Sequence, residues 1–412
     1  MLYGNGATFL RDCISVDGAQ NSAFRVKTTM TTRFRKRVLF WSERFWPTIG
    51  GVGISASNLL PALCERGYEF VVVTSKDYSD LPEEDRFKGI PVYRFPFWSS
   101  LAKGNVNQII EIRRRITQLK QTFLPDLVHI GFLGGSVVFH LHTINTHLSP
   151  LLLSMDSTLP DQELGRDSLA ARTLRTADWV TCVSAARLSE TRKLIPEIIN
   201  RSSVIYNGRP VPSCEPKPLP FEAPRLLCLG RLDRIKGFDI ALTALTSVVH
   251  CFPKAHLVIA GDGPERAVLE AQAARLGLEA NVDFVGWVSP DEVPGLMNRA
   301  TIIIIPSRNE GLPNVAKEAA FLARPIVATN VGGIPEAVTH GETGLLINRE
   351  DSNALAKAIT FLLDHPETAA TMGHAGRLRA QEVFSLEHYI DTYDDLYRRL
   401  MESVKRTTST LS

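Results

Sequence analysis

The sequence predicts an α/β protein with two doubly wound domains that face each other across a cleft. Its 412 residues are too many for one ordinary hydrophobic core but suit two domains. Strand-like and helix-like segments alternate from residue 37 onward, and the proline-dense stretch RPVPSCEPKPLPFEAP interrupts this alternation once. The pattern is typical of parallel sheets covered by helices. Ligands bind such sheets outside the carboxyl ends of their strands.

The first predicted domain spans residues 37–211 and follows a tail at 1–36, which shows no sustained periodicity. It begins with the strand RVLFW and the glycine-rich loop TIGGVG, followed by the helix ISASNLLPALCERG, which Gly67 ends. Further strands are predicted in the segments YEFVVVTS, GIPVYRF, DLVHI, PLLLSM, WVTCVS and SSVIYNG.

A linker at 212–224 is predicted because proline removes backbone donors and holds the chain extended. The second domain, 225–384, repeats the alternation with the strands RLLCLG, HLVIAG, VDFVGW, TIIIIPS, PIVATN and GLLIN. Residues 385–412 read as a final helix.

The composition excludes several classes of protein. A formal net charge of +2 argues against nucleic-acid binding through a strong global field. The six cysteines are scattered without a C-x-x-C pair, which favours a reducing compartment and gives no sign of a zinc site. No apolar stretch is long enough to span a bilayer, and we expect a cytoplasmic protein.

The segment SRNEGLPNVAKE, 307–318, combines a loop with a helix start. Pro313 suits the first turn of a helix, and the amides of Leu312 and Asn314 would then favour a phosphate there. Glu310 could accept a hydrogen bond from a sugar hydroxyl, and Glu318, one turn into the helix, could meet a ribose. The alternative is that Glu310 is only a turn residue and Glu318 only a solvated helix residue, since two glutamates at such a spacing are common by accident.

The segment GVGISA, which contains Gly51 and Gly53, fits the G-x-G-x-x-A pattern of a dinucleotide site. The fingerprint is incomplete, because Lys76 precedes Asp77 where an acidic residue should end the second strand. A nicotinamide-dependent oxidoreductase is therefore an alternative function, and close strand–helix packing is a structural explanation for the same glycines.

Several spaced motifs resemble family 4 retaining glycosyltransferases with the GT-B fold of two Rossmann-like domains. The E-x7-E pattern and the following G-G-x-P-E turn correspond to Glu310, Glu318, Gly332, Gly333, Pro335 and Glu336. The segments LCLGRLDRIKGFDIAL, IAGDGPER, VDFVGWVSPDEV, FWPTIGGVG, PDLVH and VIYNG match in the same order. The resemblance covers nearly everything from residue 38 to the C-terminus.

The resemblance implies a nucleoside-diphosphate-sugar donor, with no resident cofactor or metal ion. The cations matching its diphosphate-neutralising pair are Arg231 and Lys236, and with Glu310 they form the predicted catalytic set. The donor would also contact Gly51, Gly53, Gly230, Gly286, Trp287, Val288, Gly311, Leu312, Pro313, Asn314 and Glu318. Trp287 could stack on the base or belong to the core. The final helix would cross back to the first domain. A sugar, lipid-linked or small-molecule acceptor would bind to that domain.

Two positions depart from the family pattern. Asp156 stands where many members carry a histidine, so it becomes a candidate contact for the sugar or acceptor together with Asn207. Arg324 stands where relatives usually have glycine, which we expect to change only a helix end. A non-catalytic nucleotide-binding protein is a further alternative. A glycoside hydrolase is disfavoured, since cations placed for a diphosphate serve no purpose in it.

Three histidines and one basic helix suggest other sites. The alternation of His140 and His142 predicts one strand face, with His147 nearby, but no complete metal-ligand set is visible and ordinary packing is favoured. The helix NQIIEIRRRITQLKQTF could lie on an anionic membrane at the inner face, although covering the sheet explains its apolar stripe equally well.

Overall fold

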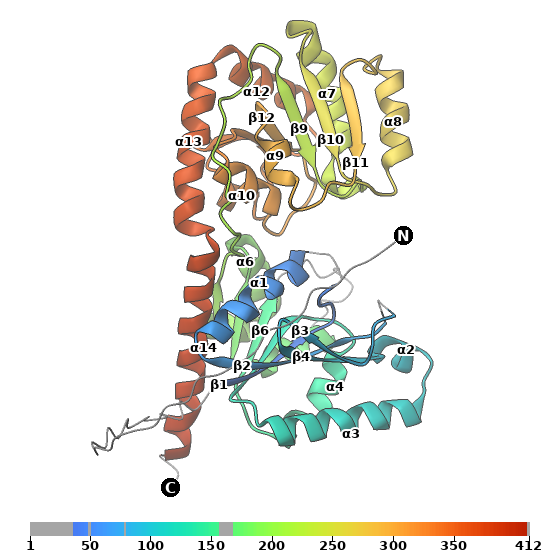
Figure 1. Cartoon of the computed structure of the whole chain (residues 1–412), viewed down its shortest axis with the longest axis vertical. Helices are drawn as coiled ribbons and strands as arrows, with labels where there is room; N and C mark the ends of the chain where they lie inside the picture. The colour runs from blue at the N-terminus through green and yellow to red at the C-terminus, as the bar shows by residue number, and fades with distance from the viewer. Residues whose placement is uncertain (1–35, 48–50, 78–79, 156–167, 410–412) are drawn as a thin grey trace, which may run out of the picture. The chain divides into compact units, whose positions relative to one another are not determined.

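A computed structural model describes residues 36–47, 51–77, 80–155 and 168–409 (Figure 1). The predicted tail lies outside these ranges, apart from Lys36, which begins the first strand. Within the described part of the chain, the α/β prediction with two largely parallel sheets is confirmed. No helix in these ranges is both long enough and apolar enough to cross a bilayer.

The first sheet has the strand order β3-β4-β2-β1-β5-β6-β7-β8 and is parallel except for the β3–β4 pair. Its strands are β1 Lys36–Ser42, β2 Tyr68–Ser75, β3 Glu84–Phe87, β4 Ile90–Phe95, β5 Leu127–Phe132, β6 Leu151–Met155, β7 Trp179–Cys182 and β8 Ser202–Val204. The edge strand β3 was not predicted, because its residues EDRF lack the apolar alternation that marks a strand.

Six α-helices among the described residues alternate with the strands of the first sheet. They are α1 Gly51–Glu65, α2 Phe97–Ala102, α3 Val106–Phe123, α4 Val137–His142, α5 Leu169–Thr176 and α6 Ala185–Leu194, with short 3-10 turns at η1 Ile144–Thr146 and η3 Pro196–Arg201. The apolar stripe of α3, including Ile112 and Ile116, packs in the core beneath the sheet. Packing therefore accounts for the stripe without a membrane.

Two sequence predictions about this region were wrong. Gly51 and Gly53 begin α1 and do not belong to a loop. His140 and His142 lie on α4 and not on a strand, because a short apolar run with alternation also fits a buried helix.

The second sheet is parallel in the order β11-β10-β9-β12-β13-β14. Its strands are β9 Arg225–Leu229, β10 His256–Ala260, β11 Val282–Gly286, β12 Ile302–Ile305, β13 Ile326–Thr329 and β14 Gly344–Ile347. Its helices are η4 Arg234–Lys236, α7 Phe238–Cys251, α8 Arg266–Arg275, α9 Val293–Met297, α10 Asn314–Phe321, α11 Ile334–Ala337, α12 Ser352–Asp364 and α13 Pro366–Val383.

Both sheets are buried on two faces, as parallel sheets require. In β1, Val38 and Phe40 join one core cluster, whereas the alternating Leu39 and Trp41 join the cluster on the opposite face. The same alternation divides β9 between two clusters of the second sheet.

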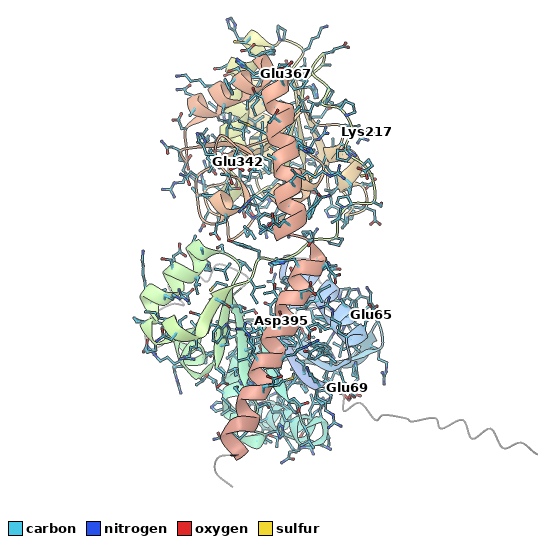
Figure 2. All side chains as sticks on the ribbon, turned by 90° about the vertical axis from the view of Figure 1, so that its left-hand side faces the viewer. Glu65, Glu69, Lys217, Glu342, Glu367 and Asp395 are labelled. Atoms are coloured by element: carbon cyan, nitrogen blue, oxygen red, sulfur yellow. The ribbon has the colours of Figure 1, made fainter. Side chains whose placement is uncertain are left out.

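The final helix, α14 Leu386–Ser409, packs against the first sheet. Tyr389, Tyr393 and Tyr397 recur every four residues and lie in the core with β1, β2 and α1. Figure 2 shows Asp395 on this helix, with Glu65 at the end of α1 and Glu69 in β2. The helix is anchored by a buried hydrogen bond between Nδ1 of His129 in β5 and the hydroxyl of Tyr397, at 2.6 Å. Nε2 of the same ring shares a hydrogen bond of 2.7 Å with the hydroxyl of Ser154 in β6, which in turn lies 2.9 Å from the hydroxyl of Tyr393.

Arg324 does more than change a helix end. Its side chain is almost fully buried, and its guanidinium donates to the carbonyls of Ala300 and Lys217. Burial lowers the pKa of Arg324 to about 10. The residue therefore ties the predicted linker to the chain that enters β12.

Candidate functional site

The switch point of the second sheet lies between β9 and β12. The chain passes from β9 outward to β10 and β11 and then returns to add β12 on the other side. Loops at the carboxyl ends of such neighbouring strands diverge and leave room for a ligand. Gly230 follows β9 and Ser307 follows β12, so the loops that carry Lys236 and Glu310 begin at this edge.

Lys236 and Glu310 form an ion pair across the switch point. The Nζ of Lys236 donates to Oε1 of Glu310 at 2.6 Å, and the hydroxyl of Ser307 donates to the same oxygen at 2.9 Å. Among the described residues, none donates to the second carboxylate oxygen of Glu310, Oε2. The two residues that the sequence assigned to diphosphate and sugar are thus brought together, with one carboxylate oxygen left to accept.

Glycines allow the loops that carry this pair to lie close together. Gly237, directly after Lys236, has φ +67° and meets the carbonyl of Pro306 so closely that a Cβ could not fit. Gly332 has φ +52° and lies in the same way against the carbonyl of Glu310, while the amide of Gly333 donates to that carbonyl at 3.2 Å. The absence of a side chain therefore allows the G-G turn to pack directly against the backbone of the Glu310 loop.

Helix α10 starts one residue later than the sequence predicted. Pro313 precedes the helix in an extended conformation, with φ −69° and ψ 124°, and Asn314 is the first helical residue. The first amides of α10 have no partner within the helix, which makes this end suitable for an anion. Gly311 and Leu312 complete the loop between Glu310 and the helix.

Arg231 and Trp287 extend from the same edge into solvent. The side chain of Arg231 is 71% exposed and lies 3.5 Å from Asp233, so it does not join the Lys236–Glu310 pair. Trp287, which follows Gly286 at the end of β11, is 62% exposed. The core alternative for this tryptophan is therefore wrong, and Val288 is the neighbour that packs against the core.

Glu318 pairs with Arg209, a residue that the sequence analysis did not single out. The adjacent Lys317 is fully buried, and its Nζ donates to the carbonyl of Asn207 at 2.7 Å. Helix α10 is therefore attached to the chain that leaves β8. The only signal in the sequence is the basic residue in YNGRP, beside the predicted Asn207.

Glu336, part of the recognised G-G-x-P-E turn, links the two halves of the chain. Its carboxylate accepts from the amides of Ala185 at 2.6 Å and Ala186 at 2.9 Å. These are the first residues of α6, where a negative charge complements the helix dipole. Nothing in the local sequence pattern around Glu336 indicated this role.

Arg308 was also missed. Its guanidinium bonds both Asp239, at the start of α7, and Glu350, which follows β14. Hydrogen bonds to these carboxylates raise the pKa of Arg308. The side chain holds the loop after β12 against the start of α7 and against the turn after β14, and its only signal in the sequence was its place in the SRNEG segment.

The first sheet contributes a less complete set. Asp156 lies outside the described residues. Asp77 accepts from the amides of Trp98 and Ser99 and so caps α2, which leaves it badly placed for the ribose of a dinucleotide. Glu43, after β1, is almost fully buried, and its Oε2 accepts from the amide of Ser136 at 3.0 Å. Burial raises the pKa of Glu43.

The three histidines do not converge. His140 is buried beside Trp41 at a ring distance of 5.6 Å, His142 is exposed, and His147 bonds the carbonyl of Pro125. Among the described residues, no group of three or more potential ligands could hold a metal ion. Burial lowers the pKa of His140 to about 3, so the ring is neutral.

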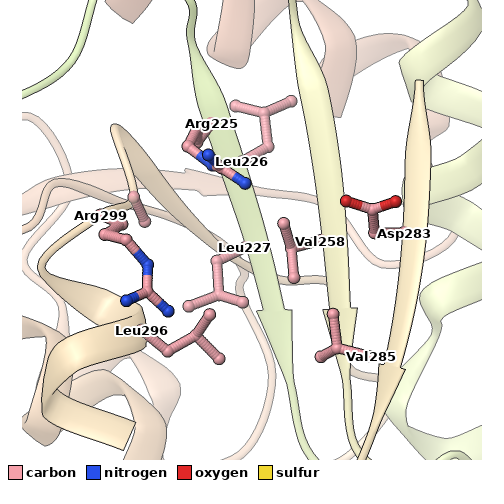
Figure 3. A pocket seen from close by; sticks show the side chains of 9 residues that line it. Arg225, Leu226, Leu227, Val258, Asp283, Val285, Leu296 and Arg299 are labelled. Atoms are coloured by element: carbon pink, nitrogen blue, oxygen red, sulfur yellow. The ribbon is translucent and has the colours of Figure 1, made fainter. Parts of the chain in front are cut away.

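A separate hollow of about 110 Å³ lies on the second sheet (Figure 3). Leu227 and Val258 form its floor, and Arg225, Arg299 and Asp283 lie around it. It lacks the predicted donor residues. Leu296 of the short helix α9 also lines it.

Comparisons with known proteins cover both halves of the chain. The model of Glycosyltransferase Family 4 matches residues 49–211, and that of Glycosyl transferases group 1 matches residues 215–379. A glycogen synthase of Mycobacterium tuberculosis is 29% identical over 385 residues, which covers 84% of this chain and 91% of the relative.

Solved structures share the fold of most of the chain. Sucrose-phosphate synthase from Thermosynechococcus elongatus has a TM-score of 0.75 at 22% identity and covers 90% of this chain and 100% of its own. Anabaena HepE in complex with UDP has a TM-score of 0.72 at 21% identity, with coverage of 88% and 100%.

Proposed function

Because the chain belongs to the group 1 glycosyl transferases and has their GT-B fold, we propose that it transfers a sugar from a nucleoside diphosphate to an acceptor hydroxyl with retention of anomeric configuration. The observation that carries this proposal is the Lys236–Glu310 pair at the switch point of the second sheet. HepE, which has the same fold, was solved with UDP.

In the proposed reaction, the acceptor oxygen forms a bond to the anomeric carbon while the bond from that carbon to the diphosphate oxygen breaks. The electron pair leaves with the diphosphate, which takes up the proton of the acceptor. Lys236 and the exposed Arg231 would stabilise the charge that develops on the leaving group. No strong protein base is needed for this step.

Glu310 would orient the donor sugar. Its Oε1 is occupied by Lys236 and Ser307, so Oε2 is the oxygen proposed to accept from a sugar hydroxyl. The first amides of α10 would bind the phosphate, and Trp287 would stack on the base because its ring is exposed at the end of β11. Rate acceleration would then come from orientation and fixed charge.

The acceptor is proposed to be a sugar, a lipid-linked sugar or a small molecule in glycan, polysaccharide or glycolipid synthesis. A lipid-linked acceptor would bring the protein to a membrane surface. The exposed Val106, Ile110 and Arg113 of α3 suit a peripheral contact of this kind.

The test is a panel of UDP-, GDP- and ADP-sugars, measured by thermal stabilisation and by slow release of free sugar. One nucleotide class should raise the melting temperature and be hydrolysed, and EDTA should leave the rate unchanged because the two cations need no metal ion. Product anomers are assigned by NMR. An inverted product would contradict retention, and absence of stabilisation by every donor would contradict the proposed function.

A further inference from the structure

The segment Asn207–Arg209, which leaves the first sheet and is called the connector below, lies where the first sheet, the end of α13 and the start of α14 meet. The amide of Arg209 donates to the carbonyl of Phe384 at 2.9 Å, and the amide of Leu386 donates to the carbonyl of Arg209 at 2.9 Å. Phe384 belongs to a core cluster of the second sheet, whereas Leu386 packs against the core beneath α14. The backbone of Arg209 is therefore fixed where α13 ends and α14 begins.

The close packing of Gly208 makes this position still more defined. A Cβ on Gly208 would overlap Tyr389 of α14 and would lie 2.7 Å from the carbonyl of Ser385. Tyr389 lies in the core with the first sheet. The connector thus has little freedom to shift along α14, and the direction in which Arg209 leaves the backbone is determined.

From this fixed backbone the guanidinium of Arg209 reaches Glu318 on α10. The two side chains expose only 16% and 18% of their surface, so the pair is shielded from solvent. An Nη of Arg209 donates to Oε1 of Glu318. Among the described residues, none donates to the other oxygen, Oε2. Oε2 is therefore able to accept from a ligand hydroxyl.

Two buried polar atoms of this segment, one on Arg209 and one on Asn207, lack protein partners within the described part of the chain. Among the described residues, none accepts from Nε of Arg209 and none donates to Oδ1 of Asn207. A buried donor or acceptor without a partner is costly and calls for an explanation. A ribose hydroxyl can donate to a carboxylate oxygen, so a nucleotide ribose could supply the partner that Oε2 of Glu318 lacks.

We propose that Arg209 is a positioning residue for nucleotide recognition, which orients the carboxylate of Glu318 toward the ribose of the donor. This inference rests on the proposed function, because it takes the donor to be a nucleotide sugar and Glu318, as the sequence predicts, to contact its ribose. The connector fixes Arg209, Arg209 fixes Glu318, and Lys317 fastens the same turn of α10 to Asn207. The ribose site is then built partly from the segment that joins the two sheets.

The experiment compares a ligand that has a ribose with one that has only phosphates. Calorimetric titration measures the Kd of UDP, GDP and ADP, and of inorganic pyrophosphate, for the wild type, Arg209→Met and Arg209→Lys. Arg209→Met should weaken the best nucleoside diphosphate by about ten-fold or more but change pyrophosphate by less than about two-fold. Arg209→Lys should lie between the wild type and Arg209→Met, since lysine keeps the charge but not the planar fork.

A double-mutant cycle tests whether Arg209 acts through Glu318. In a Glu318→Gln background, Arg209→Met should add less than about two-fold to the nucleotide Kd. Arg192→Met is the matched control, because Arg192 is also partly buried but bonds Ser202 within the first sheet. Its nucleotide affinity should equal that of the wild type.

Equal weakening of nucleotide and pyrophosphate by Arg209→Met would overturn the inference, and so would full additivity with Glu318→Gln or unchanged nucleotide binding. The proposed function would survive these results. If Arg209→Met does not fold, the ratio of nucleotide to pyrophosphate affinity in Arg209→Lys decides, and an unchanged ratio overturns the inference. A wild type that binds none of the three nucleotides would overturn the proposed function and this inference with it.

Discussion

Two basic side chains at the carboxyl edge of the second sheet differ from two buried bases of the first sheet in the partners that they bond. At the carboxyl edge of the second sheet, Lys236 and Arg308 are paired with carboxylates, whereas Lys120 and His129, both buried in the core of the first sheet, bond only neutral groups. Burial lowers the pKa of Lys120 to about 7 and that of His129 to about 3. Burial without an anion favours the neutral form of a basic side chain, and a nearby carboxylate favours its charged form.

The difference separates structural from exchangeable interactions. The neutral network of the first sheet, from His129 through Ser154 to α14, is complete within the protein. The Lys236–Glu310 pair lies in loops at the carboxyl edge of the second sheet. An anionic ligand with hydroxyl groups could replace part of this pairing, because its anion would bind Lys236 and a hydroxyl group would donate to Glu310. We therefore expect variants of the second sheet to affect turnover and variants of the first to affect stability.

The largest effect is expected for Glu310→Gln. The amide keeps the shape but loses the charge that holds Lys236 and the acceptor strength offered to a sugar hydroxyl. The kcat/KM for the donor should fall by about 10²–10³-fold. Glu279→Gln changes an exposed glutamate and should leave kcat/KM unchanged. Comparable kinetics of Glu310→Gln and wild type would remove Glu310 from the site.

Tyr397→Phe should mainly destabilise the fold. It removes the hydroxyl that bonds Nδ1 of the buried His129, which leaves that nitrogen without a partner. Denaturant unfolding should show a loss of about 1–3 kcal/mol. The donor KM should stay near its wild-type value. A stability equal to that of the wild type would mean that the network does not anchor α14.

The stability of the wild type should depend on pH through Lys120. Its pKa is about 7 when folded and 10.5 in the unfolded reference, so the unfolded state binds more protons in this window. Stability should therefore rise with pH from 7 toward 10, by at most about 1.4 kcal/mol per pH unit from this group. Lys120→Met should flatten the dependence, whereas Lys254→Met, at an exposed position, should not. Parallel curves for wild type and Lys120→Met would show that Lys120 stays charged.

The smallest effect is expected for Trp287→Ala. Since the indole is exposed and supports no core, its loss should leave the melting temperature unchanged. Loss of stacking on the base should raise the donor KM by about five-fold while kcat stays constant. An unchanged KM would place the base elsewhere along the edge.

Local pattern determined what the sequence could predict. Strands such as β12 were evident because four consecutive isoleucines fit a strand buried on two faces. The helix α4 was mistaken for a strand, since His140 and His142 alternate within a short apolar run. Gly51 was assigned to a loop because glycine weakens helices, although α1 begins there.

The site could be predicted only where a motif marked it. Lys236 and Glu310 were found through their motifs, and their pairing emerged once the strand order placed β9 beside β12. The pair between Arg209 and Glu318 joins residues 109 positions apart, and no local spacing could indicate it. Such contacts follow from the path of the connector.

The central claim is that the Lys236–Glu310 edge binds the diphosphate of a nucleotide sugar. The most direct measurement is a calorimetric titration of the wild type, Lys236→Met and Lys254→Met with the nucleoside diphosphate that the wild type binds most tightly. We predict that Lys236→Met weakens binding by about 100-fold, because a fixed cation facing the diphosphate is lost, and that Lys254→Met binds like the wild type. Equal affinity of Lys236→Met and the wild type would contradict the claim.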